Sequence, residues 1–456
     1  MNTFWRVTRV RGASGSTLVL SVALCVSAVV FASRACAEPR FGDSTWVAPS
    51  AAVFDDSTAE GPRVAKPDHE RRWETALRTP FRVAFLPLRF AARGLEAGVG
   101  RYGERLLTPK PKRPPKRFSI GPRIDLGGAK DGDLNDVGLG PSLDSEGFPV
   151  SSAELSLHGS WTINDRRRVR FTGDVREGRP VSFRVRGDYD YKPNRRYYGV
   201  GNDVRKEARA YFLLENTRIE AELVLGASQV RQLRFLGGFS SMSPRRGSHG
   251  SPLLEDVFNP TNTPFYHETT RELLYGVSGD FAALDDRRDP SHGFHGHADL
   301  RHAVGLDDGD PDYNQWFFEG RTYIPVFAKR RVIAVRCVYA GIDPTGDGAT
   351  QIPFYRLTMS DGPMRFAAYA SQRFRDRQLM LARVEYRWMI WRRLSAVALY
   401  DLGEVAPNLK AFTARGAHAS YGGGLRIGVG DGIATRFDVA TGSEGINAVV
   451  RLGSGF

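Results

Sequence analysis

The chain has 456 residues and a formal net charge of +13. Of its three cysteines, Cys25 and Cys36 lie in a segment that we expect to be removed. Cys337 is then left alone, which excludes an internal disulfide and a cysteine-based zinc site. After residue 37 no apolar run approaches 18 residues, so a transmembrane helix is not expected there. Membrane strands need only about ten residues of alternating hydrophobicity, so these observations do not exclude a transmembrane β-barrel.

The first 37 residues have the pattern of a cleaved secretory signal peptide. Arg6, Arg9 and Arg11 precede an apolar run over residues 18–32, and Ala-Cys-Ala at 35–37 fits a cleavage site. The segment holds four arginines and no acid, so the mature charge is 13 − 4 = +9. We therefore expect outer-membrane lipid and lipopolysaccharide phosphates as counter-ions, and no nucleic acid.

Residues 38–116 form a separate Arg- and Pro-rich segment. The apolar spacing within 81–107 predicts one or two short amphipathic helices, interrupted at Pro80 and Pro87. A Pro- and Lys-rich linker follows at 108–117. Three interpretations stay open for 81–107, namely a plug, a helix on the membrane surface and a loosely attached lead-in.

From residue 117 the hydrophobic period changes to two, with one apolar and one charged face per segment. The fold prediction is all-β, a sixteen-stranded antiparallel transmembrane β-barrel over 117–456, preceded by a short helical lead-in. The sixteen segments are 117–126, 151–162, 166–176, 180–191, 205–214, 216–227, 231–242, 270–282, 292–304, 314–326, 330–342, 379–390, 393–402, 417–428, 432–441 and 445–456.

The last of these segments has the pattern of a C-terminal barrel signal. Val450 and Leu452 lie on the same face as the final residue, Phe456. An apolar residue at every second position before a terminal aromatic resembles the signal of bacterial outer-membrane barrels.

Motifs of enzymes are absent from the sequence. It contains no nucleophile elbow, no P-loop and no H-E-x-x-H. His292, His295 and His297 lack a clear third and fourth ligand nearby, so we interpret them as strand-end residues. The sequence therefore predicts neither an enzyme nor a cofactor or metal.

Five stretches resemble, in order, the barrel of the bacterial surface antigen family, a superfamily of outer-membrane assembly and translocation barrels of the BamA and TamA type. They are RRYYGVGND at 195–203, LDDRRDPSHGF at 284–294, IPFYRLTMSDGP at 352–363, RFRDRQLMLARVEYRW at 373–388 and ALYDLGEV at 398–405. The resemblance implies a long loop that folds into the barrel, here between residues 342 and 379.

In the family this loop carries an aliphatic-Arg-Gly-aromatic motif whose arginine reaches the barrel wall. This sequence departs from it, with Ala and Ala at the Arg and Gly positions. The candidate loop residues are Arg365, Phe366, Ala367, Ala368, Tyr369, Arg373 and Arg375. An arginine inside the lumen needs a carboxylate, and Asp401 and Glu385 are the expected inward-facing partners of Arg365, with Arg373 and Arg375 as rival donors.

Family members commonly carry periplasmic POTRA domains, and residues 38–116 show no strand and helix pattern of that kind. The resemblance implies insertion or translocation of proteins or lipids at the bacterial outer membrane, with client outer-membrane proteins or periplasmic factors as partners. We expect a monomer. Two alternatives are a solute pore and a structural or accessory barrel that has lost insertase activity.

Overall fold

The structure is a computed structural model. It describes residues 118–125, 138–148, 150–176, 180–228, 231–287, 289–326, 331–345, 351–391, 394–413, 415–429 and 432–452. The predicted signal peptide, the segment 38–116 with its helices, and Phe456 lie outside the described residues.

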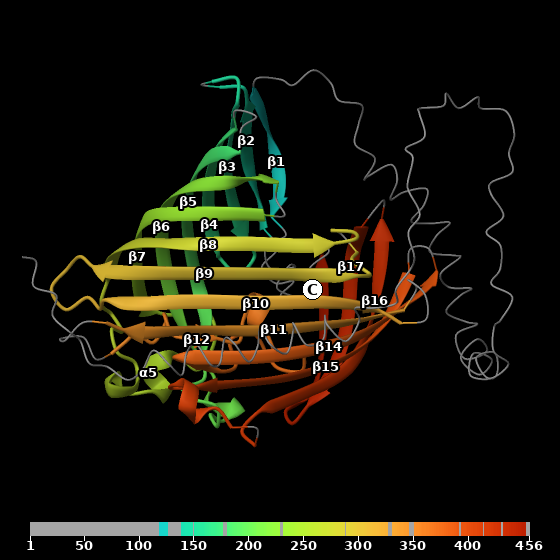
Figure 1. Cartoon of the computed structure of the whole chain (residues 1–456). Coiled ribbons are helices and arrows are strands. Elements are labelled where there is room, and N and C mark those ends of the chain that lie inside the picture. Colours follow the sequence, from blue (N-terminus) through green and yellow to red (C-terminus); the bar gives the residue numbers. More distant parts are fainter. Residues whose placement is uncertain are drawn as a thin grey trace, which may run out of the picture. The chain divides into compact units, whose positions relative to one another are not determined.

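Sixteen strands form one antiparallel sheet in which each strand pairs with its neighbours along the chain (Figure 1). In order they are β1 (Phe118–Asp125), β2 (Gly138–Glu146), β3 (Ala153–Thr162), β4 (Arg167–Arg176), β5 (Val181–Tyr197), β6 (Ala210–Ser228), β7 (Arg231–Arg246), β8 (Thr270–Leu284), β9 (Gly293–Gly305), β10 (Tyr313–Pro325), β11 (Arg331–Pro344), β14 (Gln378–Trp391), β15 (Leu394–Ala406), β16 (His418–Val429), β17 (Gly432–Gly442) and β18 (Gly445–Leu452). The predicted fold, a sixteen-stranded antiparallel barrel, is confirmed.

The remaining elements lie in the connections. Strands β12 (Thr358–Met359) and β13 (Arg375–Asp376) pair with each other between β11 and β14. The helix α5 (Leu254–Val257) lies in the β7–β8 connection, which also holds the 3-10 turn η3 (Pro260–Asn262). The other 3-10 turns are η2 (Lys206–Ala208), η4 (Gly362–Met364) and η5 (Leu409–Ala411). None of the helices in the described ranges is both long and apolar enough to cross a membrane.

Alternation along each strand separates an apolar outer face from a charged inner face. On β5, Phe183 is 47% exposed, whereas the next residue, Arg184, donates to the carboxylate of Asp174 at 3.0 Å. On β7, Phe235 is 46% exposed while Arg234 donates to Ser278 Oγ at 2.9 Å. The charged side chains therefore line the lumen, as the period of two predicts.

Two strand predictions were wrong, and the errors offset each other in the count. Residues 205–214 and 216–227 were expected as two strands, but β6 runs unbroken from Ala210 to Ser228. The polar residues Glu215 and Asn216 stay in the ladder, opposite Tyr191 and Asp190. The strand β2 was missed because its sequence, GLGPSLDSE, is rich in residues that strands usually avoid.

Candidate functional site

The connection between β11 and β14 contacts the inner wall on many sides. Its first described part, residues 351–357, meets β5, β6, β7 and β8, and residues 365–369 meet β15, β16 and β18. Contacts to strands so far apart in the sheet place the segment inside the barrel. Here it is called the inward loop, residues 351–377.

The entry of the inward loop is held by an aromatic cluster and a buried ion pair. Phe354 is fully buried and its ring lies 5.1 Å from that of Tyr197 on β5. Arg356 pairs with Glu272 of β8, which also accepts a 2.6 Å hydrogen bond from the hydroxyl of Tyr313. Because charge and bulk are both buried here, this end of the loop is firmly anchored.

The backbone of Ala367 and Ala368 is hydrogen-bonded to three strands of the wall. The Ala367 amide donates to Asp401 Oδ2 of β15 at 2.8 Å, and the Ala368 amide donates to Ser420 Oγ of β16 at 3.2 Å. Asn447 of β18 donates its side-chain amide to the Ala367 carbonyl at 2.8 Å. The loop therefore contacts the last strand of the sheet directly.

The two aromatic residues of this segment fit against glycines of the wall. A Cβ added to Gly403 would lie 2.3 Å from the ring of Phe366, so only glycine leaves room for this ring on β15. A Cβ on Gly442 would lie 3.1 Å from the hydroxyl oxygen of Tyr369, which also contacts Ser443 Oγ at 2.9 Å. The space that the Phe366 ring occupies thus explains why the ALYDLGEV stretch has a glycine at position 403.

The cation that binds Asp401 is Arg383 of β14, which sequence reasoning missed. Arg383 donates through Nε at 2.6 Å and Nη2 at 2.7 Å, and Asp401 is fully buried. The two residues are directly opposite in the ladder. Arg365 of the loop lies close by, since its carbonyl accepts from Arg383 at 3.1 Å, while its own Nε donates to the Tyr369 carbonyl at 3.4 Å.

The other two loop arginines lie away from Asp401. Arg373 pairs with Glu444 at 2.6 Å, in the turn between β17 and β18. Arg375 donates to the Phe354 carbonyl at 2.9 Å, and its guanidinium lies 5.0 Å from the centre of the Tyr197 ring. Burial and the nearby Arg195 lower the pKa of Arg375 to about 10, so this guanidinium stays charged at neutral pH.

The segment RRYYGVGND joins the inward loop to the β15–β16 connection. The Gly201 amide donates to the Arg375 carbonyl at 2.8 Å, in a backbone with a positive φ of +109° that favours glycine. Asn202 accepts from the Val405 amide at 3.2 Å and donates to the Gly416 carbonyl at 2.5 Å. Three of the stretches that carry the family resemblance therefore meet at one place.

Glu385, the second predicted partner, binds three arginines. It is fully buried and accepts from Arg387 at 3.0 Å, from Arg426 of β16 at 2.6 Å and from Arg436 of β17 at 3.1 Å. Such a buried carboxylate holds three strands of the wall together through charge.

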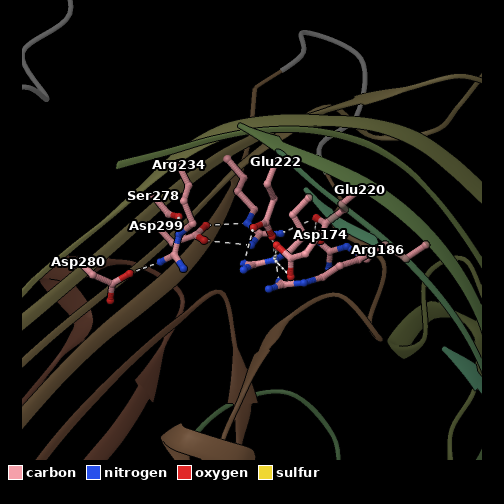
Figure 2. A network of polar contacts seen from close by, with 11 residues as sticks. Asp174, Arg186, Glu220, Glu222, Arg234, Ser278, Asp280 and Asp299 are labelled. Carbon is pink, nitrogen blue, oxygen red and sulfur yellow. Dashed lines mark hydrogen bonds and ion pairs between the residues drawn. The ribbon is translucent and has the colours of Figure 1, made fainter. Parts of the chain in front are cut away.

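On the opposite part of the wall, β4 to β9 carry a second polar network (Figure 2). Glu222 of β6 accepts from Arg186 at 2.9 Å, and Glu220 accepts from Arg301 at 2.9 Å. Asp280 of β8 pairs with Arg234 of β7. The lumen wall is thus lined by ion pairs that reach across strands.

Two of the three histidines named from the sequence, His295 and His297, lie beside Asp280. His297 contacts its carboxylate at 2.9 Å and His295 at 3.5 Å. In the described part of the chain no group of three or more His, Cys, Asp or Glu side chains is arranged to hold a metal ion.

Asp285 organises the turn that opens β9. Its carboxylate accepts from the backbone amides of Ser291 at 2.9 Å and His292 at 3.0 Å. Partial burial opposes its charge, but hydrogen bonds from Ser291, His292 and Asp286 outweigh that and lower its pKa to about 2. Gly293 follows with a φ of +118°, so the motif LDDRRDPSHGF codes for a turn.

Of the predicted C-terminal signal, Val450 and Leu452 lie in β18, opposite Phe437 and Thr435 of β17. The apolar residue Val450 is paired with the outward-facing Phe437, which is 42% exposed.

Comparison with known proteins identifies a family. The Omp85 superfamily domain matches residues 149–444, about two thirds of the chain. A search of curated proteins finds no match. Among solved structures, BamA from Haemophilus ducreyi lacking POTRA domains 1–3 is similar with a TM-score of 0.50 and 15% identity, over 73% of this chain and 70% of that one.

Two CdiB structures are also similar. CdiB from Acinetobacter baumannii has a TM-score of 0.40 and 10% identity, over 69% of this chain. CdiB from Escherichia coli has a TM-score of 0.44 and 12% identity, over 76% of this chain. The chain spans 56% and 64% of the lengths of these two structures.

Proposed function

The chain belongs to the Omp85 superfamily, and from this premise we propose that it inserts or translocates proteins or lipids at the bacterial outer membrane. Barrels of this superfamily are outer-membrane proteins of the insertion and translocation type. The proposed role needs no bond chemistry and therefore no cofactor. The barrel acts as a monomer in this proposal, with unfolded outer-membrane proteins as clients.

The observation that carries the proposal is the attachment of the inward loop to the last strands of the sheet. Asn447 donates to the carbonyls of Ala367 at 2.8 Å and Tyr369 at 3.3 Å, so the loop is bonded to β18 itself. In this proposal the barrel opens a seam between its first and last strands. A loop that binds the last strand from inside is placed to control that seam.

The described strands at the two ends of the sheet support the same mechanism. β1 and β18 have eight residues each, whereas β6 has 19. Among the described residues, the sheet pairings end at β1 and β18 without joining them. The seam of the proposal lies between these two end strands.

The test uses the purified full chain, refolded into liposomes and shown by heat-modifiable gel mobility to be folded. An unfolded test outer-membrane protein is added, and its folding rate is compared with that in empty liposomes. We expect faster folding with the barrel present, and slower folding again with Gly403→Val, which displaces Phe366 and the loop. Equal rates in empty and barrel-containing liposomes would contradict the proposal.

A solute pore is the second candidate, favoured by the charged lumen that the inward loop occupies. The ion pairs of β4 to β9 form a hydrophilic wall, and the loop fills the lumen beside it. Conductance in planar bilayers that rises strongly when residues 351–374 are deleted, together with no effect on client folding, would favour the pore.

A further inference from the structure

Three arginines lie directly opposite one another on the last three strands. In the ladder Arg426 of β16 faces Arg436 of β17, which in turn faces Arg451 of β18. Strands are about 4.8 Å apart, so the row gathers three guanidinium groups within roughly 10 Å of wall. Like charges directly opposite each other destabilise a sheet unless another charge balances them.

The row faces the lumen. Arg426 and Arg436 are 2% and 1% exposed and reach the buried carboxylate of Glu385. Arg451 is four residues after Asn447, whose side chain contacts the inward loop, so alternation directs Arg451 to the same inner face.

The nearby carboxylates do not balance the charge of this part of the wall. The groups that act electrostatically on the row or on its partner Glu385, taken together with Asp401, the partner of Arg383, amount to six arginines and four acids, 6 − 4 = +2. They are Arg365, Arg383, Arg387, Arg426, Arg436 and Arg451 against Asp289, Glu385, Asp401 and Asp438.

Two members of the row have donors to spare within the described part of the chain. Arg451 makes no hydrogen bond or ion pair there, and three of the four charged groups that act on it are arginines. The Nε of Arg426 is buried without a hydrogen-bond partner among these residues. A buried donor of this kind is costly unless an acceptor comes to it.

We propose that Arg426, Arg436 and Arg451 form a binding site for a phosphate group on the inner wall of the barrel. Guanidinium forks match the oxygens of phosphate, and a tetrahedral phosphate would add acceptors for this row beyond the two oxygens of Glu385, which already accept from Arg387, Arg426 and Arg436. The site lies beyond the docked residues 366–369, toward the end of the sheet where only two residues separate β14 from β15 and β16 from β17. It does not depend on insertase activity.

Binding is measured by calorimetry on the full chain, folded in zwitterionic detergent, with inorganic phosphate as the probe. Chloride and acetate at the same ionic strength are the comparison anions. We expect saturable phosphate binding, and about tenfold weaker binding for Arg451→Gln, since a hydrogen bond to a charged group is lost. Arg186→Gln removes a lumen arginine that is 41% exposed and pairs with Glu222, and should bind phosphate as the wild type does.

Soluble glycerophosphoglycerol, a phosphodiester headgroup, separates the two sources of phosphate. Tighter binding of the diester identifies a lipid headgroup, and tighter binding of inorganic phosphate identifies a soluble phosphate; both support the site. If acetate binds equally well, the row takes a carboxylate, such as that of a client chain, and the proposal is wrong. It is also wrong if Arg451→Gln, folded by gel mobility, binds phosphate as the wild type does.

Discussion

Replacing Asp401 with alanine tests the charge pairing that holds the inward loop. Asp401 is fully buried and accepts three hydrogen bonds of 2.6–2.8 Å, two from Arg383 and one from the Ala367 amide. Asp401→Ala leaves the guanidinium of Arg383 buried without the carboxylate that accepts its hydrogen bonds. Removing one partner of a buried ion pair costs about 3–5 kcal/mol.

A double variant separates two parts of the expected loss of stability, the unpaired buried charge and the lost hydrogen bond of the Ala367 amide. When Arg383→Met is combined with Asp401→Leu, no buried charge is left unpaired, and such exchanges are often nearly neutral. The Ala367 amide still loses its acceptor, which costs about 1–3 kcal/mol. The double variant should therefore recover part of the stability that Asp401→Ala loses.

The assay is urea unfolding of the liposome-embedded barrel, followed by heat-modifiable gel mobility and tryptophan fluorescence. Asp188→Ala is the matched control, because Asp188 is 36% exposed and pairs with Arg170, which is 46% exposed. Water screens that pair, so its loss should cost no more than about 1 kcal/mol. If Asp401→Ala unfolds at the same urea concentration as the control, the reasoning about the buried pair is refuted.

Three further outcomes are expected. Gly403→Val should push Phe366 off the wall and expose the inward loop to protease, whereas Gly237→Ala, with open space around its Cβ, should not; equal cleavage would exclude the steric account. Asn447→Ala should also raise loop cleavage, because it removes both bonds to β18. Asp285 has a pKa of about 2 against an ordinary 3.8, so its contribution to stability is complete above pH 4 and lost as pH falls toward 2; Asp285→Asn should flatten that part of the pH profile.

The alternation of charged and apolar residues predicted the sheet because membrane strands must bury charge on one side only. It failed where local composition misled. In β2, Pro141 has no amide to donate, yet it lies in the ladder opposite Pro122. In β6, the polar pair Glu215 and Asn216 resembles a turn, but Asn216 continues the strand on the lumen side with Glu220 and Glu222, and Glu215 accepts from the Tyr189 hydroxyl at 2.9 Å on the other face.

The inward direction of Asp401 and Glu385 followed from parity alone, whereas their partners did not. Arg383 meets Asp401 because the β14–β15 hairpin places them opposite each other. The alternation excludes a shift of one residue, which would turn every side chain to the other face, but a shift of two residues keeps both faces and changes every partner. The three arginines around Glu385 come from three strands, so only the assembled wall reveals them.

The alanines at the motif positions fit a wall that supplies its own cation. Arg383 already neutralises Asp401, so an arginine at the position of Ala367 is not needed to balance the buried carboxylate. The backbone of residues 367–368 then donates to Asp401 and Ser420 and accepts from Asn447, and only the bond to Asp401 involves a charge. When residues 366–369 leave the wall, the Arg383–Asp401 pair stays intact, and the two ion pairs of the loop, Arg356–Glu272 and Arg373–Glu444, lie outside this segment. Detaching residues 366–369 therefore costs less free energy than detaching a segment held by an ion pair, which suits the proposed release of the last strand.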